Sequence, residues 1–222
     1  MLRGINMKRY KYVIFDLDGT LLDTAQDLAD SVNFALEKAG LPLRSLDEIK
    51  LFVGNGVENL VRRAVGQDPT EPEFLKVLSD FKQHYAHNIA NKTAPFPGVC
   101  DLLQQLRRRG IDVAVASNKY QHGVEELCEL YFPGLYTIAL GEREGVLRKP
   151  DPSVVFTAIE EMQGSRPDTV YIGDSEVDGE TAHNAGVDFI GVSWGLRPVH
   201  MLHESGALEV VDKADQLLKF FI

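Results

Sequence analysis

The chain has 222 residues, of which 44% are hydrophobic and 25% are charged, so it can fill a core and we expect a folded protein rather than a disordered one. Its formal net charge is −10 and no long basic run occurs, which argues against a nucleic-acid partner and against an anionic membrane surface. An anionic substrate would therefore need cationic side chains at its binding site.

The first predicted element is a buried strand from Tyr10 to Phe15, rich in aromatic and β-branched residues. Asp16 and Asp18 follow it directly and Gly19 breaks it, so we expect both acids at the carboxyl end of the strand. In an open α/β sheet, ligands bind at that end. Two carboxylates this close repel each other unless a divalent cation or a shared proton relieves them. Taken alone, the pattern is also typical of a solvated acidic turn.

The segment from Asp23 to about Asn91 has helical spacing throughout and no evident strand. Gly40 and Pro42 end its first helix, near residue 39, and Ser45 with Glu48 predicts a capping box for the second. The other three helices are predicted at residues 45–52, 57–65 and 71 to about 88. The apolar face of the last helix is expected to consist of Phe74, Leu75, Leu78, Phe81 and Tyr85.

After residue 98 the pattern changes to short strands alternating with helices. Strands are predicted at 111–116, 136–140, 169–172, 189–192 and 208–211, and helices at 99–109, 121–131, 153–162, 176–185 and 214–220. Such alternation indicates a parallel sheet with crossover helices on both faces. We therefore predict an α/β fold, in which a doubly wound (Rossmann-like) parallel sheet core of residues 1–22 and 95–222 carries an all-helical subdomain inserted at residues 23–94.

Polar residues follow three further strands or loops of this core. Ser117, Asn118 and Lys119 offer a hydroxyl and backbone N–H groups that suit an anion, although a plain helix cap has the same pattern. Lys149 lies in a loop stiffened by two following prolines, which fixes where it points; out of context it would be a solvated lysine. Asp174 follows a later strand, and we expect it to face the first acids across the sheet opening.

Four strings of the sequence together resemble the four motifs of the haloacid dehalogenase-like (HAD) phosphohydrolase superfamily. They are FDLDGTLLDT at residues 15–24, the Ser-Asn pair at 117–118, KPDP at 149–152 and GDSEVD at 173–178. The resemblance spans nearly the whole chain. It implies a phosphatase acting on a small phosphorylated metabolite, and it identifies the helical insertion after the first motif as the structure that this superfamily calls a cap.

The resemblance also assigns roles to the motif residues. Asp16 would be the nucleophile that forms an aspartyl-phosphate, and Asp18 would be the general acid and base. Ser117 would bind the phosphate with Asn118 beside it. Lys149 would pair with both the phosphate and the nucleophile.

A Mg²⁺ site is implied by the same motifs. Asp174 would bind the ion together with Asp16 and the main-chain carbonyl of Asp18, and the ion would screen the repulsion between the phosphate dianion and the attacking carboxylate. Oxygen donors without a histidine or cysteine cluster favour Mg²⁺ over zinc. Asp178 is either a partner of the metal-binding residues or an acid favoured by the dipole at a helix start.

Because the core motifs recognise only phosphate, we expect the cap to select the leaving group. The turn Gly54-Asn55-Gly56 begins the string GNGVENLVRRA, which resembles the cap loop of phosphoglycolate phosphatases, although any glycine turn that caps a helix has similar features. The expected substrate is therefore 2-phosphoglycolate. Two alternatives stay open: a sugar phosphomutase (β-phosphoglucomutase-like) of the same superfamily, and a non-enzymatic receiver-type module whose phosphoaspartate is a signal.

The remaining reactive or polar residues are expected to be structural or solvated. No secretory signal and no transmembrane span is readable, and Cys100 and Cys128 lack metal-type spacing, so we expect reduced thiols in a cytoplasmic protein. The sequence leaves monomer and homodimer open. Trp194 is expected to pack against its neighbours. The residues expected to be solvated are His84, His87, Arg148, Glu176 and Arg197.

Overall fold

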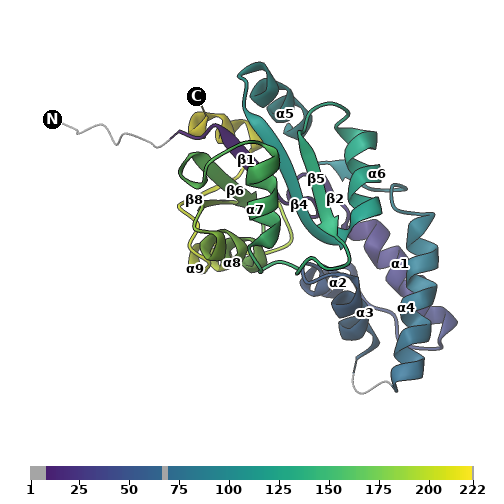
Figure 1. Ribbon diagram of the computed structural model, residues 1–222. Helices are drawn as coiled ribbons and strands as arrows, with labels where there is room; N and C mark the ends of the chain where they lie inside the picture. Colours follow the sequence, from purple (N-terminus) through teal and green to yellow (C-terminus); the bar gives the residue numbers. More distant parts are fainter. Residues whose placement is uncertain (1–8, 67–69, 222) are drawn as a thin grey trace.

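A parallel sheet with helices around it forms one part of the molecule, and a group of helices beside it forms the other (Figure 1). The computed structural model describes residues 9–66 and 70–221. Within these residues six parallel strands follow the order β5-β4-β1-β6-β7-β8. The strands are β1 (Tyr12–Phe15), β4 (Asp112–Tyr120), β5 (Ile138–Glu142), β6 (Thr169–Gly173), β7 (Asp188–Val192) and β8 (Glu209–Val211). Strand β1, which carries the first acids at its end, therefore lies at the centre of the sheet.

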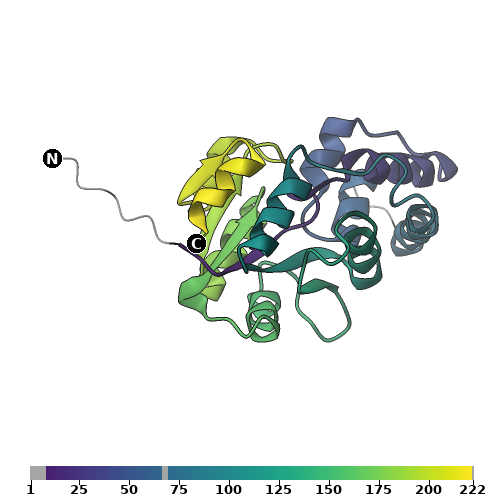
Figure 2. The same cartoon turned by 90° about the horizontal axis from the view of Figure 1, so that it is seen from above.

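Helices cover both faces of this sheet (Figure 2). Along β1 the side chains alternate, because Val13 and Phe15 enter one buried cluster while Ile14 enters the other. The first face carries α5 (Val99–Arg108), α6 (Gln121–Tyr131) and the 3₁₀ helix η2 (Ala214–Phe220), and the second carries α7 (Ser153–Glu161), α8 (Glu176–Ala185) and α9 (Val199–Glu204). The predicted doubly wound α/β fold is confirmed.

An all-helical cap is inserted between β2 (Leu22–Asp23) and β3 (Ala94–Pro95). These two short strands pair antiparallel, with Leu22 opposite Pro95, so the chain leaves and re-enters the sheet domain at adjacent points. The cap consists of α1 (Ala25–Lys38), α2 (Leu46–Phe52), α3 (Val57–Val65) and α4 (Glu71–Ala86). The sequence predicts that the two chain crossings lie close together, but it does not predict that they pair as strands.

Local sequence rules explain most of the cap helices. Ser45 and Glu48 form the predicted capping box at α2, and Thr70 starts α4 in the same way. Each such cap is worth about 1 kcal/mol, because it pairs backbone N–H groups that have no partner within the helix. The predicted apolar face of α4 was wrong at Leu75, which is 52% exposed, while Val77 is buried instead. A turn of 3.6 residues puts position 77 on the face of 74, 78 and 81 and turns position 75 away from it.

Strand β4 is longer than predicted and changes the setting of the Ser-Asn pair. It runs through Ser117 and Asn118 to Tyr120, with a register irregularity after Ala116, and α6 begins only at Gln121. Ser117 is therefore not a helix cap. Its hydroxyl donates to Asp18 at 3.3 Å, so it faces the site instead.

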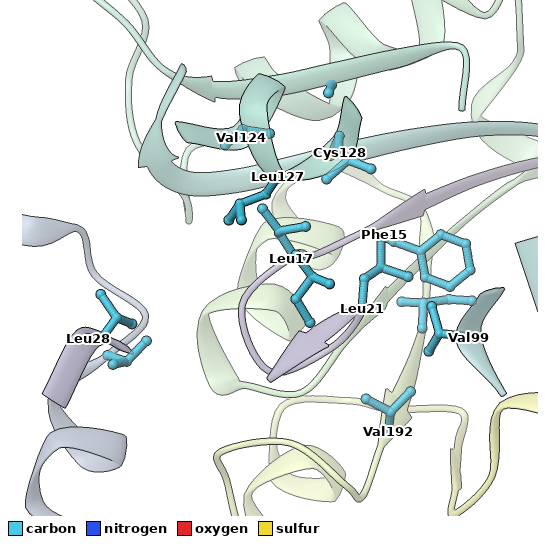
Figure 3. Packing of buried hydrophobic residues seen from close by; sticks show 14 of the residues in the cluster. Phe15, Leu17, Leu21, Leu28, Val99, Val124, Leu127, Cys128 and Val192 are labelled. Atoms are coloured by element: carbon cyan, nitrogen blue, oxygen red, sulfur yellow. The ribbon is translucent and has the colours of Figure 1, made fainter. Parts of the chain in front are cut away.

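A single hydrophobic cluster crosses from the sheet domain into the cap. Leu17 and Leu21, in the loop after β1, belong to it together with Val124 and Leu127 of α6 (Figure 3). Leu28, in the first helix of the cap, is a member of the same cluster. The cap is therefore joined to the core by shared apolar burial as well as by two chain crossings.

Both cysteines are free thiols on helices of the core. Burial raises the pKa of the Cys128 thiol to about 12, which keeps it protonated near neutral pH. None of the helices in the described ranges has the length and hydropathy needed to cross a bilayer.

Candidate active site

The predicted site residues of the core meet in one cavity beneath the cap. The residues predicted to carry the chemistry all line it: Asp16, Asp18, Ser117, Asn118, Lys149 and Asp174. The cap closes the cavity with Leu28, Val53, Gly54, Gly56, Val57 and Leu60. Two of the predicted cap-loop glycines thus face the cavity, whereas Asn55 is not among the lining residues.

Lys149 is the central cation of this arrangement. Its Nζ lies 2.8 Å from Oδ1 of Asp16 and 2.8 Å from Oδ1 of Asp178, and it also donates to Tyr171 Oη at 3.0 Å and to the carbonyl of Ala116 at 3.1 Å. Burial lowers the pKa of Lys149, but the two carboxylates outweigh that effect and hold its pKa well above the usual value. The ammonium therefore stays charged beside Asp16.

Burial makes ionisation of the acids unfavourable. It raises the pKa of Asp16 well above its usual value; Lys149 lowers that pKa, and the carboxylates of Asp178 and Asp174 raise it further. Burial also raises the pKa of Asp174 to about 7, and repulsion from Asp178 acts in the same direction. One lysine thus does not neutralise the cluster of acids.

A divalent cation fits this cluster. Asp16, Asp174 and Asp178 each offer a carboxylate oxygen, and the three oxygens lie within 4.8 Å of one another. The donors are all oxygen and the surplus charge is negative, which suits Mg²⁺. Asp178 already accepts hydrogen bonds at both oxygens, from Lys149 at one and from the hydroxyl and N–H of Ser175 at the other. Its contacts favour the interpretation in which it holds Lys149 and starts α8.

Glycines let two loops approach the acids closely. A Cβ at Gly195 would lie 2.2 Å from Cβ of Asp174, and a Cβ at Gly19 would lie 2.5 Å from Oδ2 of Asp174. The loop that follows β7 also donates a hydrogen bond from the N–H of Leu196 to Oδ2 of Asp174 at 2.7 Å, and Thr20 donates to Oδ1 at 2.9 Å. Asp174 is therefore held from two sides by backbone that only glycine allows so near.

Three donors from the described part of the chain fix Asp18. Thr24 Oγ1 and Lys119 Nζ both donate to its Oδ1, at 2.7 Å and 3.0 Å, while Ser117 donates to Oδ2 at the longer distance of 3.3 Å. Lys119 also contacts Oη of Tyr85, on cap helix α4, at 2.6 Å. No role was predicted for the side chain of Lys119, and Tyr85 was expected only as part of the apolar face of α4.

Asn118 connects the cap loop to the Lys149 loop. Its Nδ2 donates to the carbonyls of Gly54 and Lys149 at 2.9 and 3.0 Å, and its Oδ1 accepts from the N–H of Lys149 at 2.8 Å. The side-chain amide hydrogens are both used in these bonds. In this arrangement the Asn118 side chain orients the backbone of Gly54 and Lys149. Only the main chain of Asn118 could then bind an anion in the cavity.

Arg197 was predicted to be a solvated surface residue, and this was wrong. It is 5% exposed and donates to the carbonyls of Lys50 and Val53, at the end of cap helix α2, at 2.7 and 2.6 Å. Its Nε lies 2.9 Å from Oε2 of Glu176, so Glu176 is not a simply solvated acid either. Carbonyls at a helix end and a carboxylate are the partners that a buried guanidinium needs.

Two further expectations of solvated side chains were also wrong. Arg148 forms ion pairs with Glu142 of the core and with Glu58 of the cap, the latter at 3.7 Å. His84 stacks on Phe34, with ring centroids 4.2 Å apart, and its Nδ1 lies 3.0 Å from the hydroxyl of Ser31. Glu142 lies six positions before Arg148, but Glu58, Ser31 and Phe34 are distant in sequence from their partners, so no local pattern could indicate those contacts.

Fold and site define a class of protein: an α/β protein with a buried carboxylate site at the carboxyl edge of its sheet, covered by an inserted helical cap. Residues 13–192 match the family model of the haloacid dehalogenase-like hydrolases, and the chain belongs to this family. The resemblance seen in the four motifs is confirmed. The chain is thus a hydrolase.

Individual relatives agree with this assignment. A phosphoglycolate phosphatase from Rhodobacter capsulatus is 35% identical over 189 residues, covering 83% of this chain and 85% of that protein. Another from Agrobacterium fabrum is 35% identical over 193 residues, covering 85% of this chain and 83% of that protein. A solved structure from Lactobacillus delbrueckii subsp. bulgaricus, assigned by prediction as a phosphoglycolate phosphatase, has a TM-score of 0.92 and 39% identity, covering 96% of this chain and 99% of that one.

Proposed function

We propose that the protein is a Mg²⁺-dependent phosphatase that hydrolyses 2-phosphoglycolate through an aspartyl-phosphate on Asp16. It is a phosphoric monoester hydrolase. The observation that carries the proposal is the environment of Asp16, at the end of the central strand. Its Oδ1 accepts a hydrogen bond from Lys149 at 2.8 Å, while Oδ2 has no hydrogen-bond partner among the described residues. A carboxylate with one oxygen held and the other available suits a nucleophile.

The residues of the site can carry out both halves of the reaction. Asp16 attacks phosphorus, an O–P bond forms, and the ester P–O bond breaks as Asp18 donates a proton to the departing alcohol oxygen. Asp18 then takes a proton from the water that attacks the phosphoryl group, which releases inorganic phosphate and restores Asp16. Ser117 and Lys149 would stabilise the charge that shifts onto the phosphoryl oxygens.

The metal would be held by Asp16, Asp174 and the main-chain carbonyl of Asp18. When bound, Mg²⁺ screens the repulsion between an anionic phosphate and the attacking carboxylate and helps to orient them. The all-oxygen donor set and the negative charge that Lys149 leaves uncompensated support this choice. Asp178 is assigned as the residue that positions Lys149.

The cap is proposed to select the leaving group. We take residues 23–94 as the cap and residues 1–22 and 95–222 as the core, with Gly54, Asn55 and Gly56 forming the loop that selects the substrate. The apolar side chains of Val53, Val57 and Leu60 line the cavity on that side. The names of the relatives in Rhodobacter capsulatus and Agrobacterium fabrum support 2-phosphoglycolate as the substrate.

The net charge of the chain bears on which partners the enzyme can bind. The net charge of −10 supports a small phosphorylated metabolite as the partner, held by the cations of the site, rather than nucleic acid or a membrane surface. We propose that the enzyme acts in the cytoplasm as a monomer or homodimer.

Release of phosphate from 2-phosphoglycolate and from hexose phosphates, with Mg²⁺ and with a chelator, tests the proposal. We expect many turnovers on 2-phosphoglycolate, none in chelator, and hydrolysis rather than transfer to a second hydroxyl. A rearranged sugar phosphate as product would indicate the phosphomutase, and a single phosphate released per chain would indicate the receiver-type module.

Substitution of the two first acids separates their roles. Asp16→Asn is expected to abolish turnover without loss of the fold, because the nucleophilic oxygen is gone while the size of the side chain is kept. Asp18→Asn is expected to slow turnover by about 10²–10⁴-fold, as removal of a general acid and base does, and to let the aspartyl-phosphate accumulate. Mass spectrometry of acid-quenched protein detects the adduct; an Asp18→Asn variant as active as the parent contradicts the role of Asp18.

A further inference from the structure

A buried lysine from the core and a tyrosine from the cap form a chain of contacts that ends on Asp18. Lys119 is 5% exposed and lines the cavity, yet neither the four motifs nor the proposed reaction gives its side chain a role. Its Nζ lies 3.0 Å from Oδ1 of Asp18 and 2.6 Å from Oη of Tyr85. Tyr85 belongs to α4 of the cap and is 1% exposed. The contacts therefore link the proposed acid to cap helix α4.

From this geometry we propose that Lys119 is a positioning residue that fixes the carboxylate of Asp18 for proton transfer, and that Tyr85 makes this position depend on the cap. The inference rests on the proposed function of Asp18 as general acid. It goes beyond that function because it assigns a task to two residues outside the four motifs.

The distribution of donors on Asp18 supports the positioning role. Thr24 and Lys119 both donate to Oδ1, so that oxygen is anchored twice. Among the described residues Oδ2 has only the long hydrogen bond from Ser117, at 3.3 Å. A carboxylate anchored through one oxygen and loosely held at the other exchanges a proton through the second, so Oδ2 is the oxygen that would meet the leaving group.

The surroundings of Lys119 explain why this contact persists. Within the described residues Asp18 is the one carboxylate that forms an ion pair with Lys119, and a buried ammonium without its partner is strongly unfavourable. Tyr85 stacks on Phe81, with ring centroids 5.4 Å apart, so its hydroxyl is held in place by the packing of α4. Burial raises the pKa of Tyr85, which keeps the hydroxyl neutral. Lys119 is thus fixed from the core side by a charge and from the cap side by a rigid hydroxyl.

Leaving-group dependence of kcat/KM tests the proposal, because an activated aryl phosphate needs no proton on its leaving oxygen whereas an alkyl phosphate does. We compare 2-phosphoglycolate with p-nitrophenyl phosphate. Lys119→Met is expected to lower kcat/KM by about 100-fold for 2-phosphoglycolate and by less than about 5-fold for p-nitrophenyl phosphate, as loss of general-acid catalysis predicts. Tyr85→Phe, which removes only the hydroxyl, is expected to shift the same ratio in the same direction by a smaller factor.

Controls separate positioning from a general loss of structure. Lys76→Met removes an exposed lysine from α4, the cap helix that carries Tyr85. It is expected to leave kcat/KM unchanged for both substrates. Lys119→Arg keeps the positive charge and should recover part of the loss on 2-phosphoglycolate. If Lys119→Met does not fold, the ratio measured for Tyr85→Phe decides the question.

Each outcome refers to a different claim. Equal losses on both substrates in Lys119→Met and Tyr85→Phe, or no loss in either variant, would overturn the positioning role while the proposed function stands. A parent protein that hydrolyses neither substrate, or that forms no beryllium fluoride adduct on Asp16, would instead contradict the proposed function.

Discussion

Asp174 depends on two glycines, and this dependence is visible at the level of single atoms. A Cβ at Gly195 would lie 2.2 Å from Cβ of Asp174, a distance that neither backbone can tolerate without moving. We expect Gly195→Ala to displace Asp174 and lower the affinity for Mg²⁺ by at least about 10-fold, with a loss of about 1–3 kcal/mol in the free energy of unfolding. Calorimetric titration with Mg²⁺ and urea unfolding measure the two effects.

The control for this substitution is Gly110→Ala. Gly110 has a positive φ of 71°, but a Cβ there would meet nothing within 4 Å. Gly110→Ala should therefore cost about 1 kcal/mol of backbone strain and leave the affinity for Mg²⁺ unchanged. Equal Mg²⁺ affinities in the parent protein and Gly195→Ala would contradict the claim that Gly195 keeps Asp174 in position for the ion.

The limits of sequence reasoning also appear at the residue scale. Asp16, Asp18 and Asp174 could be predicted to converge, because each follows a strand and parallel strands end at one edge. Lys149 was expected beside them only because KPDP resembles a motif of the family. Lys119 could not be predicted there, since a lysine after Ser-Asn is ordinarily solvated. Its burial results from a strand that continues past Ser117 and from a tyrosine 34 positions away.

At the scale of elements, the periodic segments were predicted best. The helices Gln121–Tyr131 and Glu176–Ala185 have the predicted bounds, because their apolar spacing and end signals are local. The short helix α9 was missed, since six residues carry too little periodicity to indicate a helix. The side-chain contacts between core and cap could not be predicted: Arg197 reaches carbonyls 144 and 147 positions away.

Arg197 of the core holds the end of cap helix α2. Because its guanidinium donates to the end of α2, we expect Arg197→Met to loosen the cap loop over the cavity and to raise KM for 2-phosphoglycolate by about 10-fold or more, as loss of hydrogen bonds from a charged donor implies. Steady-state kinetics measure KM and kcat. Arg108→Met, at an exposed position of α5, is the matched control; unchanged KM in Arg197→Met would show that the arginine does not hold the cap loop.

At the scale of the whole molecule, cap and core share one hydrophobic cluster, so the acids lie inside a continuous folded unit. The cost of burying their charge is therefore a cost to the stability of the entire chain. Asp174 has a usual pKa of 3.8 and a folded pKa of about 7, so between these values the folded state binds a proton that the unfolded state releases. The contribution of Asp174 to stability must then fall as pH rises from about 4 to about 7 and stay low above that range.

Bound Mg²⁺ should reverse this loss, because it interacts with the ionised carboxylate. Each unit of pKa shift corresponds to about 1.4 kcal/mol of stability. We therefore expect ionisation of Asp174 to make the metal-free protein less stable at pH 8 than at pH 5 by about a few kcal/mol. Mg²⁺ should stabilise the protein at pH 8 and have little effect at pH 5. Urea unfolding at both pH values, with and without Mg²⁺, measures the difference. Asp174→Asn, which cannot ionise, should be the more stable protein at pH 8 without metal and should lose most of the Mg²⁺ response; an equal pH response in parent and variant would show that Asp174 is already ionised in the folded protein at pH 5.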